Sequence, residues 1–109
     1  LSVILGAFGA HGLKTRLTPE MLTTFETGVQ YQFYHSLGLI LVGVILHAVK
    51  TSTMVSAAGG LMVAGIVLFS GSLYLICFTG LRSFGMIAPI GGTAFIAAWL
   101  LLAIGVLRL

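Results

Sequence analysis

The residues best able to do chemistry are concentrated in one short segment, which begins at Glu26 and ends at His35. On a helix, Glu26, Gln30 and Tyr34 follow one another at spacing four and share a face. Tyr31 and His35 form a second pair at the same spacing, adjacent to the first. A carboxylate, an amide, phenols and an imidazole are therefore expected along one broad side of a helix.

Two interpretations of this candidate polar cluster are open. The functional one is a proton-handling or ligand-binding site, because Glu26 and His35 can change charge near neutral pH. The structural one is a set of groups that bond to one another and fix the helix register. Glu26 also lies close enough to the expected helix start to be solvated at the membrane interface. Neighbours from other segments are expected to join, so that the candidate cluster comprises His11, Glu26, Gln30, Tyr31, His35, Ser70 and Tyr74.

Metal and cofactor chemistry find little support in the sequence, and we predict neither. His11 and His35 on neighbouring helices could hold a haem between two imidazoles, but no spacing rule supports this hypothesis. The single cysteine, Cys77, allows neither a disulfide nor a zinc cluster, and we expect it to be a small buried hydrophobe. No Gly-x-Ser-x-Gly, phosphate-loop or His-Glu-x-x-His motif occurs, so an enzyme is not predicted.

The composition requires a lipid environment for most of the surface. Of the 109 residues, 59% are hydrophobic and only 6% are charged, too few to cover a soluble domain. The mean hydropathy is +1.19. The net charge is +3, but the basic residues stand singly at the ends of apolar runs, as in membrane proteins. Nucleic-acid binding is not predicted, because no basic patch interleaved with aromatics occurs.

Four apolar stretches predict an all-α integral membrane bundle of four transmembrane helices in a single domain, residues 1–109. The first stretch would span only about 20 Å, against roughly 30 Å of hydrocarbon, so we expect a helix truncated before Leu1. The second starts at Thr18-Pro19-Glu20, where Thr is a good cap and Pro suits the first turn. It is either one long tilted helix or an interfacial helix that bends near Gly28. The stretches are 1–13, 19–50, 54–79 and 86–107.

Small and hydroxyl residues in the later stretches predict how helices pack. Ser56, Gly60 and Ala64 form a stripe at spacing four, a close-packing surface for another helix of this chain or of a partner. Ser70 and Ser72 are expected to bond back to carbonyls of their own helix. Ser70 also shares a face with Tyr74 and could reach the polar cluster. The basic residues do not decide the orientation: Lys14, Arg16 and Arg82 fall on one side, Lys50 and Arg108 on the other.

Four ordered segments, taken together, resemble a known family. They are 6–12 (GAFGAHG), 24–37 (TFETGVQYQFYHSL), 68–74 (LFSGSLY) and 89–92 (PIGG). The chain is similar to the small membrane-protein family filed as domain of unknown function 423, related to mitochondrial transmembrane protein 256. The resemblance implies four membrane helices in the bacterial inner membrane or, in eukaryotes, the mitochondrion, and residues missing before Leu1. It implies no reaction, but it raises interest in the polar residues inside the motifs.

We therefore expect a non-catalytic small subunit or scaffold that binds another membrane protein, its own copies or lipid. The alternative is a transport or proton-coupled role built on Glu26, Gln30, His35 and His11. Four short helices leave little room for a pathway, so that role would require an oligomer. A haem or quinone protein is a third class.

Overall fold

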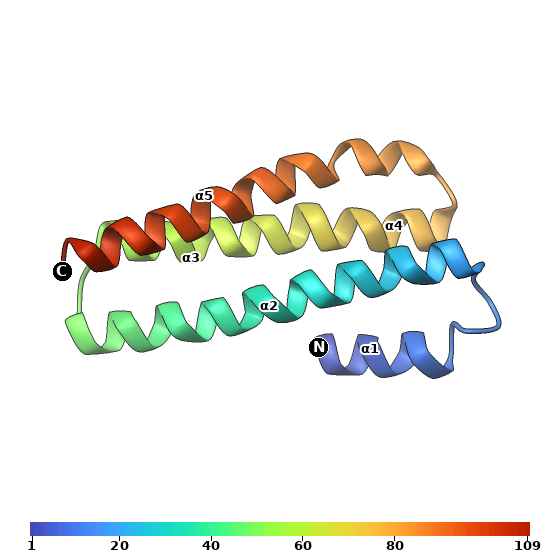
Figure 1. Ribbon diagram of the computed structural model, residues 1–109, viewed down its shortest axis with the longest axis horizontal. Helices are drawn as coiled ribbons and strands as arrows, with labels where there is room; N and C mark the ends of the chain where they lie inside the picture. The colour runs from blue at the N-terminus through green and yellow to red at the C-terminus, as the bar shows by residue number, and fades with distance from the viewer.

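The computed structural model describes residues 1–109 as four helical rods without a strand. The first two rods are single α-helices. The third contains one π-helical turn between two α-helices, and the fourth opens with a 3-10 helix (Figure 1). In chain order the elements are α1 (Ser2–His11), α2 (Pro19–Val49), α3 (Thr53–Gly65), the π-helix η1 (Ile66–Ser70), α4 (Gly71–Thr79), the 3-10 helix η2 (Arg82–Met86) and α5 (Ala88–Leu107).

Three of the rods are long and apolar enough to cross a membrane: Pro19–Val49, Thr53–Thr79 and Arg82–Leu107. The predicted all-α membrane bundle is thereby confirmed. The first rod, α1, has 10 residues and is about 15 Å long, half of the roughly 30 Å hydrocarbon core. Like the predicted stretch 1–13, it is too short to span that core by itself.

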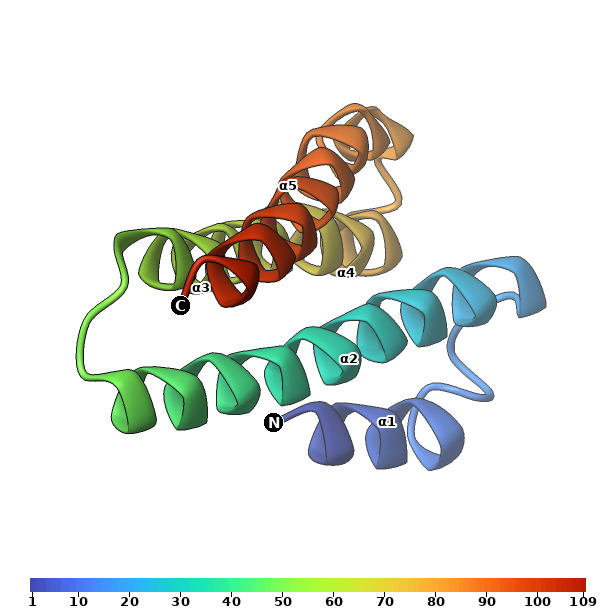
Figure 2. The same ribbon diagram turned by 60° about the vertical axis from the view of Figure 1, so that its left-hand side comes forward.

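The rods form a flat bundle with extents of 49 × 26 × 15 Å. Helix α1 packs beside the first half of α2, antiparallel to it (Figures 1 and 2). Both α2 and α5 pack on the α3–η1–α4 rod, but their backbones hardly approach each other, as the turned view in Figure 2 shows. Contacts between α2 and α5 are therefore made by side chains, among them His35 with Phe95 and Trp99.

Helix α2 is continuous over its 31 residues. Of the two predicted arrangements, the single long helix is therefore correct and the helix that bends near Gly28 is not. The hydroxyl of Thr18 accepts from the Met21 N–H at 3.2 Å and caps the start. The helix ends where Lys50 takes a positive φ of 68°. The third rod ends at Gly80 with φ 73°, a left-handed conformation that glycine adopts without strain. The boundaries of α2 agree to within one residue with the predicted stretch 19–50.

The core consists of two clusters at opposite ends of the bundle. Near Lys50, six apolar residues from α2, α3 and α5 pack together. Near the α1–α2 loop, Leu13, Phe25 and Cys77 form the second cluster. Cys77 is buried, as predicted, and its thiol also donates to the Met21 carbonyl at 3.2 Å. The first cluster contains Val42, Val55, Ala58, Met62, Ala98 and Leu102.

Candidate functional site

The structure divides the candidate polar cluster between the interior and the lipid-facing surface. His35 lies nine residues after Glu26 and therefore half a turn around α2 from it, at about 100° per residue. His35 is 4% exposed and Ser70 is fully buried, whereas Glu26 and Gln30 are exposed on the outer side of α2. His11 is exposed at the end of α1 and makes no side-chain hydrogen bond.

Three side-chain hydrogen bonds join α2 to the third rod, and the two next to Gly28 form a seam. The Ser70 hydroxyl donates to the Gly28 carbonyl at 2.7 Å, and the Tyr74 hydroxyl donates to Oε1 of Gln32. Gly28 makes this approach possible, since a Cβ there would lie 2.8 Å from the Tyr74 ring. The seam thus fixes the register of the third rod against α2.

The seam changes the expectation for Ser70 and involves one residue that was not predicted. Ser70 does not bond back within its own helix as predicted, because the π-turn directs it into the core against the Gly28 carbonyl. Ser72 does bond back, to the Phe69 carbonyl at 2.8 Å, three residues earlier. Gln32 lies in the quoted motif but was not among the predicted candidates. Its spacing of four from Gly28 was the signal that could have identified it.

His35 is held from both sides. Its Nδ1 bonds to the Tyr31 carbonyl at 2.7 Å, and its Nε2 accepts from the indole N–H of Trp99 at 2.9 Å. A carbonyl only accepts and an indole N–H only donates. Nδ1 therefore carries the single proton, and the imidazole is neutral in this arrangement. Trp99, the one tryptophan of the chain, was not predicted, although a tryptophan in a span needs a partner for its N–H.

The haem hypothesis built on His11 and His35 is wrong for this fold. Both ring nitrogens of His35 are already bonded, so no lone pair is free for iron. His11 is at the loop end of α2, while His35 is 16 residues, or roughly 24 Å, along that helix. The two imidazoles cannot hold one haem. The chain has no group of three or more His, Cys, Asp or Glu that could hold a metal ion.

Glu26 and Gln30 line a small apolar pocket of about 200 Å³ between α1 and α2. Neither side chain takes part in a hydrogen bond within the chain. Gln30 lies about 30 Å along the helix from Lys50, and Glu26 about 36 Å. With Lys50 at one membrane surface, Gln30 reaches the edge of the hydrocarbon and Glu26 the headgroup region. The other lining residues are Gly6, Phe25, Val29 and Phe33.

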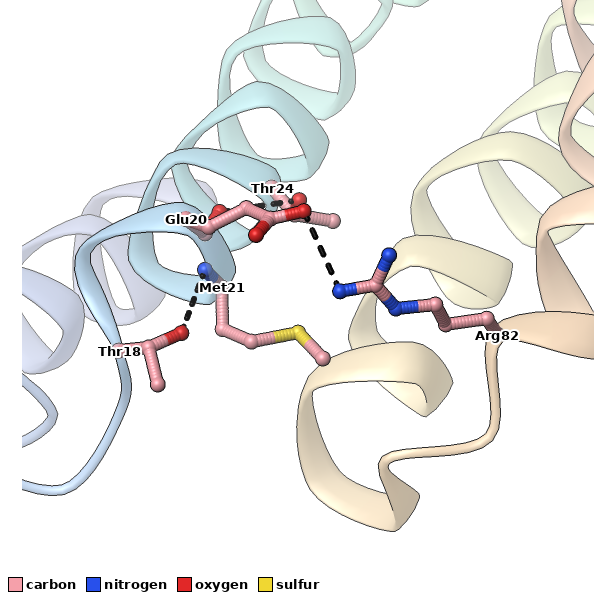
Figure 3. A network of polar contacts seen from close by, with 5 residues as sticks. All are labelled: Thr18, Glu20, Met21, Thr24 and Arg82. Atoms are coloured by element: carbon pink, nitrogen blue, oxygen red, sulfur yellow. Dashed lines mark hydrogen bonds and ion pairs between the residues drawn. The ribbon is translucent and has the colours of Figure 1, made fainter.

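An exposed ion pair closes the same end of the bundle. Arg82 donates to Glu20 at 3.3 Å, next to the Thr18 cap and the Thr24 hydroxyl, which bonds the Glu20 carbonyl (Figure 3). Both charged side chains are more than 70% exposed, at 73% and 74%. Lys14 and Arg16 share this end, and Lys50 and Arg108 lie at the other, as predicted.

The predicted packing stripe of Ser56, Gly60 and Ala64 does not pack on another helix of this chain along its length. Ser56 and Gly60 are exposed, and a Cβ at Gly60 would meet nothing within 4 Å. The neighbouring face of α3, with Val55 and Met62 fully buried, contacts α2 and α5 instead. That face is also rich in small residues, since Ala58, Gly59 and Gly65 are buried on it.

The chain is similar to several membrane proteins of bacteria. The model of the family described as a protein of unknown function, DUF423, matches residues 5–92. UPF0382 membrane protein SH2409 of Staphylococcus haemolyticus is 49% identical over 108 residues, 99% of this chain and 87% of that protein. UPF0382 membrane protein YwdK of Bacillus subtilis is 45% identical, over 99% of this chain and 88% of that protein. No solved structure matches the chain at a significant level.

Proposed function

Since the chain belongs to the DUF423 family, a multi-pass family of the bacterial inner (plasma) membrane, we propose that it is a non-catalytic small subunit or scaffold. It binds another membrane protein, its own copies or lipid. The binding surface is the outer face of α2 around Glu26 and Gln30.

One contrast carries this proposal. Inside the bundle, the side chains of Gln32, His35, Ser70 and Tyr74 are paired within the chain. On the outer face, Glu26 and Gln30 have no partner in it. Polar groups at the edge of the hydrocarbon are costly without a partner, which a neighbouring chain or a headgroup supplies. An ionised Glu26 accepts only, so the complementary group is a donor such as a guanidinium, an ammonium or a hydroxyl.

Transport or proton coupling through Glu26, Gln30, His35 and His11 is the alternative. It has less support, because Glu26 and His35 lie on opposite sides of α2 and both nitrogens of His35 are bonded. A pathway that joins them would require further copies of the chain. Proton flux into vesicles separates the two functions: a transporter loses its flux on Glu26→Gln, whereas a scaffold shows none in either form.

Native mass spectrometry of the full chain, extracted gently from its own membrane, tests the scaffold proposal. We expect a companion of defined mass that is reduced severalfold by Glu26→Gln and by Gln30→Leu. Glu20→Gln is the matched control, because Glu20 is the only other acidic residue and faces Arg82. A bare monomer, or a companion retained equally by all the variants, would overturn the proposal.

A further inference from the structure

A groove of about 510 Å³ opens to the lipid between α2 and α5, on the other side of α2 from Glu26. It exists because α2 and α5 both pack on the third rod and not on each other. Its volume lies within the roughly 300–1,000 Å³ of small-molecule sites. Five ring systems line it: Tyr31, His35, Phe69, Phe95 and Trp99.

Tyr31 and Trp99 are 39% and 40% exposed, whereas Phe95 and His35 are buried behind them and stacked on each other. Phe95 stacks on His35 with centroids 3.5 Å apart and planes at 10°. Tyr31 lies 4.8 Å from Phe69, which the π-helix η1 places in the wall. π-Turns inside α-helices occur often at functional sites. Gly92 leaves the groove open, since a Cβ there would meet only a Phe69 ring atom, at 3.9 Å.

The lining offers hydrogen bonds without charge. No acidic or basic side chain other than the neutral His35 takes part. The Thr93 hydroxyl donates to the Pro89 carbonyl at 2.8 Å and is therefore not free to donate to a ligand. The Tyr31 hydroxyl has no hydrogen-bond partner in the chain and is free to donate. A ligand that matches this lining is neutral and planar and carries an acceptor oxygen.

The depth of the groove in the membrane indicates that its ligand enters from the lipid. Pro89 lies at the start of α5, at the end of the bundle that holds Arg82. Trp99 is 11 residues beyond Ala88, about 16 Å deeper, near the middle of a bilayer of roughly 30 Å. The groove therefore runs from the headgroups to the bilayer centre and receives molecules dissolved in the hydrocarbon.

We infer that the groove binds an isoprenoid quinone. The quinone ring lies against the exposed indole of Trp99 and the partly exposed ring of Phe69, and one carbonyl accepts from the Tyr31 hydroxyl. The isoprenoid tail extends into the lipid. A phospholipid fits less well, because its headgroup is charged and it has no planar ring. The inferred role is binding alone, and it uses residues other than the Glu26 surface.

Trp99 supplies the measurement, because it is the one tryptophan of the chain and lines the groove. Two probes are titrated into the full chain in detergent: a benzoquinone and a naphthoquinone, each with a short isoprenoid tail. We expect saturable quenching of the indole fluorescence by at least one probe. Gly92→Leu fills the groove and should weaken binding at least tenfold. Tyr31→Phe removes one hydrogen bond and should weaken it about fivefold.

Matched controls lie outside the groove. Tyr34→Phe removes an exposed phenol hydroxyl, and Gly43→Leu adds a side chain where nothing lies within 4 Å. Both should leave the titration unchanged. Thr93→Phe narrows the groove from its exposed rim and replaces Gly92→Leu if that variant does not fold.

Three outcomes would overturn the inference. The first is quenching by both probes that rises linearly without saturation, which indicates collision in the detergent phase. The second is unchanged affinity in the variants that fill or narrow the groove. The third is equal competition by an isoprenoid alcohol of the same tail length, which would make the groove a site for tails only.

Discussion

The two halves of the bundle are held together by different forces. At the Lys50 end, the core is dry: Val42, Val55, Met62 and their neighbours meet without an interhelical side-chain hydrogen bond. From the middle of the bundle towards the other end, the interior holds the bonds from Trp99 to His35, from Ser70 to Gly28 and from Tyr74 to Gln32. One half depends on shape, whereas the other depends on directional pairs.

The difference shows what specifies a fold in lipid. Lipid tails are as apolar as a core side chain, so burial of apolar surface alone does not choose one helix face over another. In the half near Lys50, close packing determines which helix faces meet. In the polar half, hydrogen bonds determine it. Variants that remove one feature at a time separate these contributions, and they are given below from the largest expected effect to the smallest.

Gly91→Ala should have the largest effect, about 3 kcal/mol of destabilisation, the upper end for overpacking. The added Cβ would lie 2.8 Å from the Phe69 Cα, and backbone cannot move aside as a side chain can. The free energy of unfolding in mixed micelles measures the effect. Gly92→Ala is the control, because its Cβ meets nothing nearer than 3.9 Å. Equal stability of the two variants would contradict close packing of α5 on the π-turn.

Met62→Ala tests the dry half and should cost about 2 kcal/mol, the low end for such truncations. Met62 is fully buried, but in lipid the transfer contribution is small and the lost contacts and cavity remain. Val63→Ala, at a side chain that is 50% exposed to lipid, should change the same unfolding free energy by less than about 0.5 kcal/mol. If both variants lower the unfolding free energy equally, the buried face of α3 has been assigned wrongly.

The pair Gln32 and Tyr74 tests the polar half by a double-mutant cycle. Gln32→Leu, Tyr74→Phe and their combination should give a coupling energy of about 0.6 kcal/mol, and at most about 1.7. Each single variant leaves a partner unpaired and should therefore lose more than the coupling alone. Gln30→Leu combined with Tyr74→Phe serves as the control, since Gln30 faces outward, and it should show additivity. A coupling energy of zero between Gln32 and Tyr74 would show that this bond does not stabilise the bundle.

Glu20→Gln should have the smallest effect, at most about 0.5 kcal/mol. Its ion pair with Arg82 is exposed on both sides, so water and salt screen it. Unfolding of the wild type and the variant at low and high ionic strength measures this contribution. The small difference between them should disappear at high salt. A difference that persists would place the pair in a drier setting than its exposure indicates.

The boundaries of the helices were predictable, but the faces that they bury were not. Thr18 and Pro19 predicted the start of α2 because a cap is local chemistry. Glu26 and His35 were predicted on one broad side, yet the structure exposes Glu26 and buries His35 in the core. A soluble helix shows its buried face by its apolar stripe. A transmembrane helix that is apolar on all sides shows no such stripe. Its buried face is therefore determined by the helices that pack against it.

The π-helix was also beyond prediction from the sequence. The segment 66–70 (IVLFS) is four apolar residues followed by a serine, and nothing local distinguishes it from the α-helix around it. Its special features are contacts from elsewhere in the chain: the Phe95 ring against Gly65, and Gly91 against the backbone of Phe69. The site residues Gln32 and Trp99 were not predicted for the same reason, because their hydrogen-bond partners lie far away in the sequence.

A π-turn holds one residue more than an α-turn would, and this extra residue sets the phase between the two halves of the third rod. In a continuous α-helix Tyr74, twelve residues after Met62, would lie about 120° around the rod from it. Because the π-turn Ile66–Ser70 absorbs one residue, the two positions differ by about 20° and both face α2. Removing one residue from this segment would leave an α-turn with Tyr74 still facing α2, so the third rod can lose that residue without losing either its packed half or its hydrogen-bonded half.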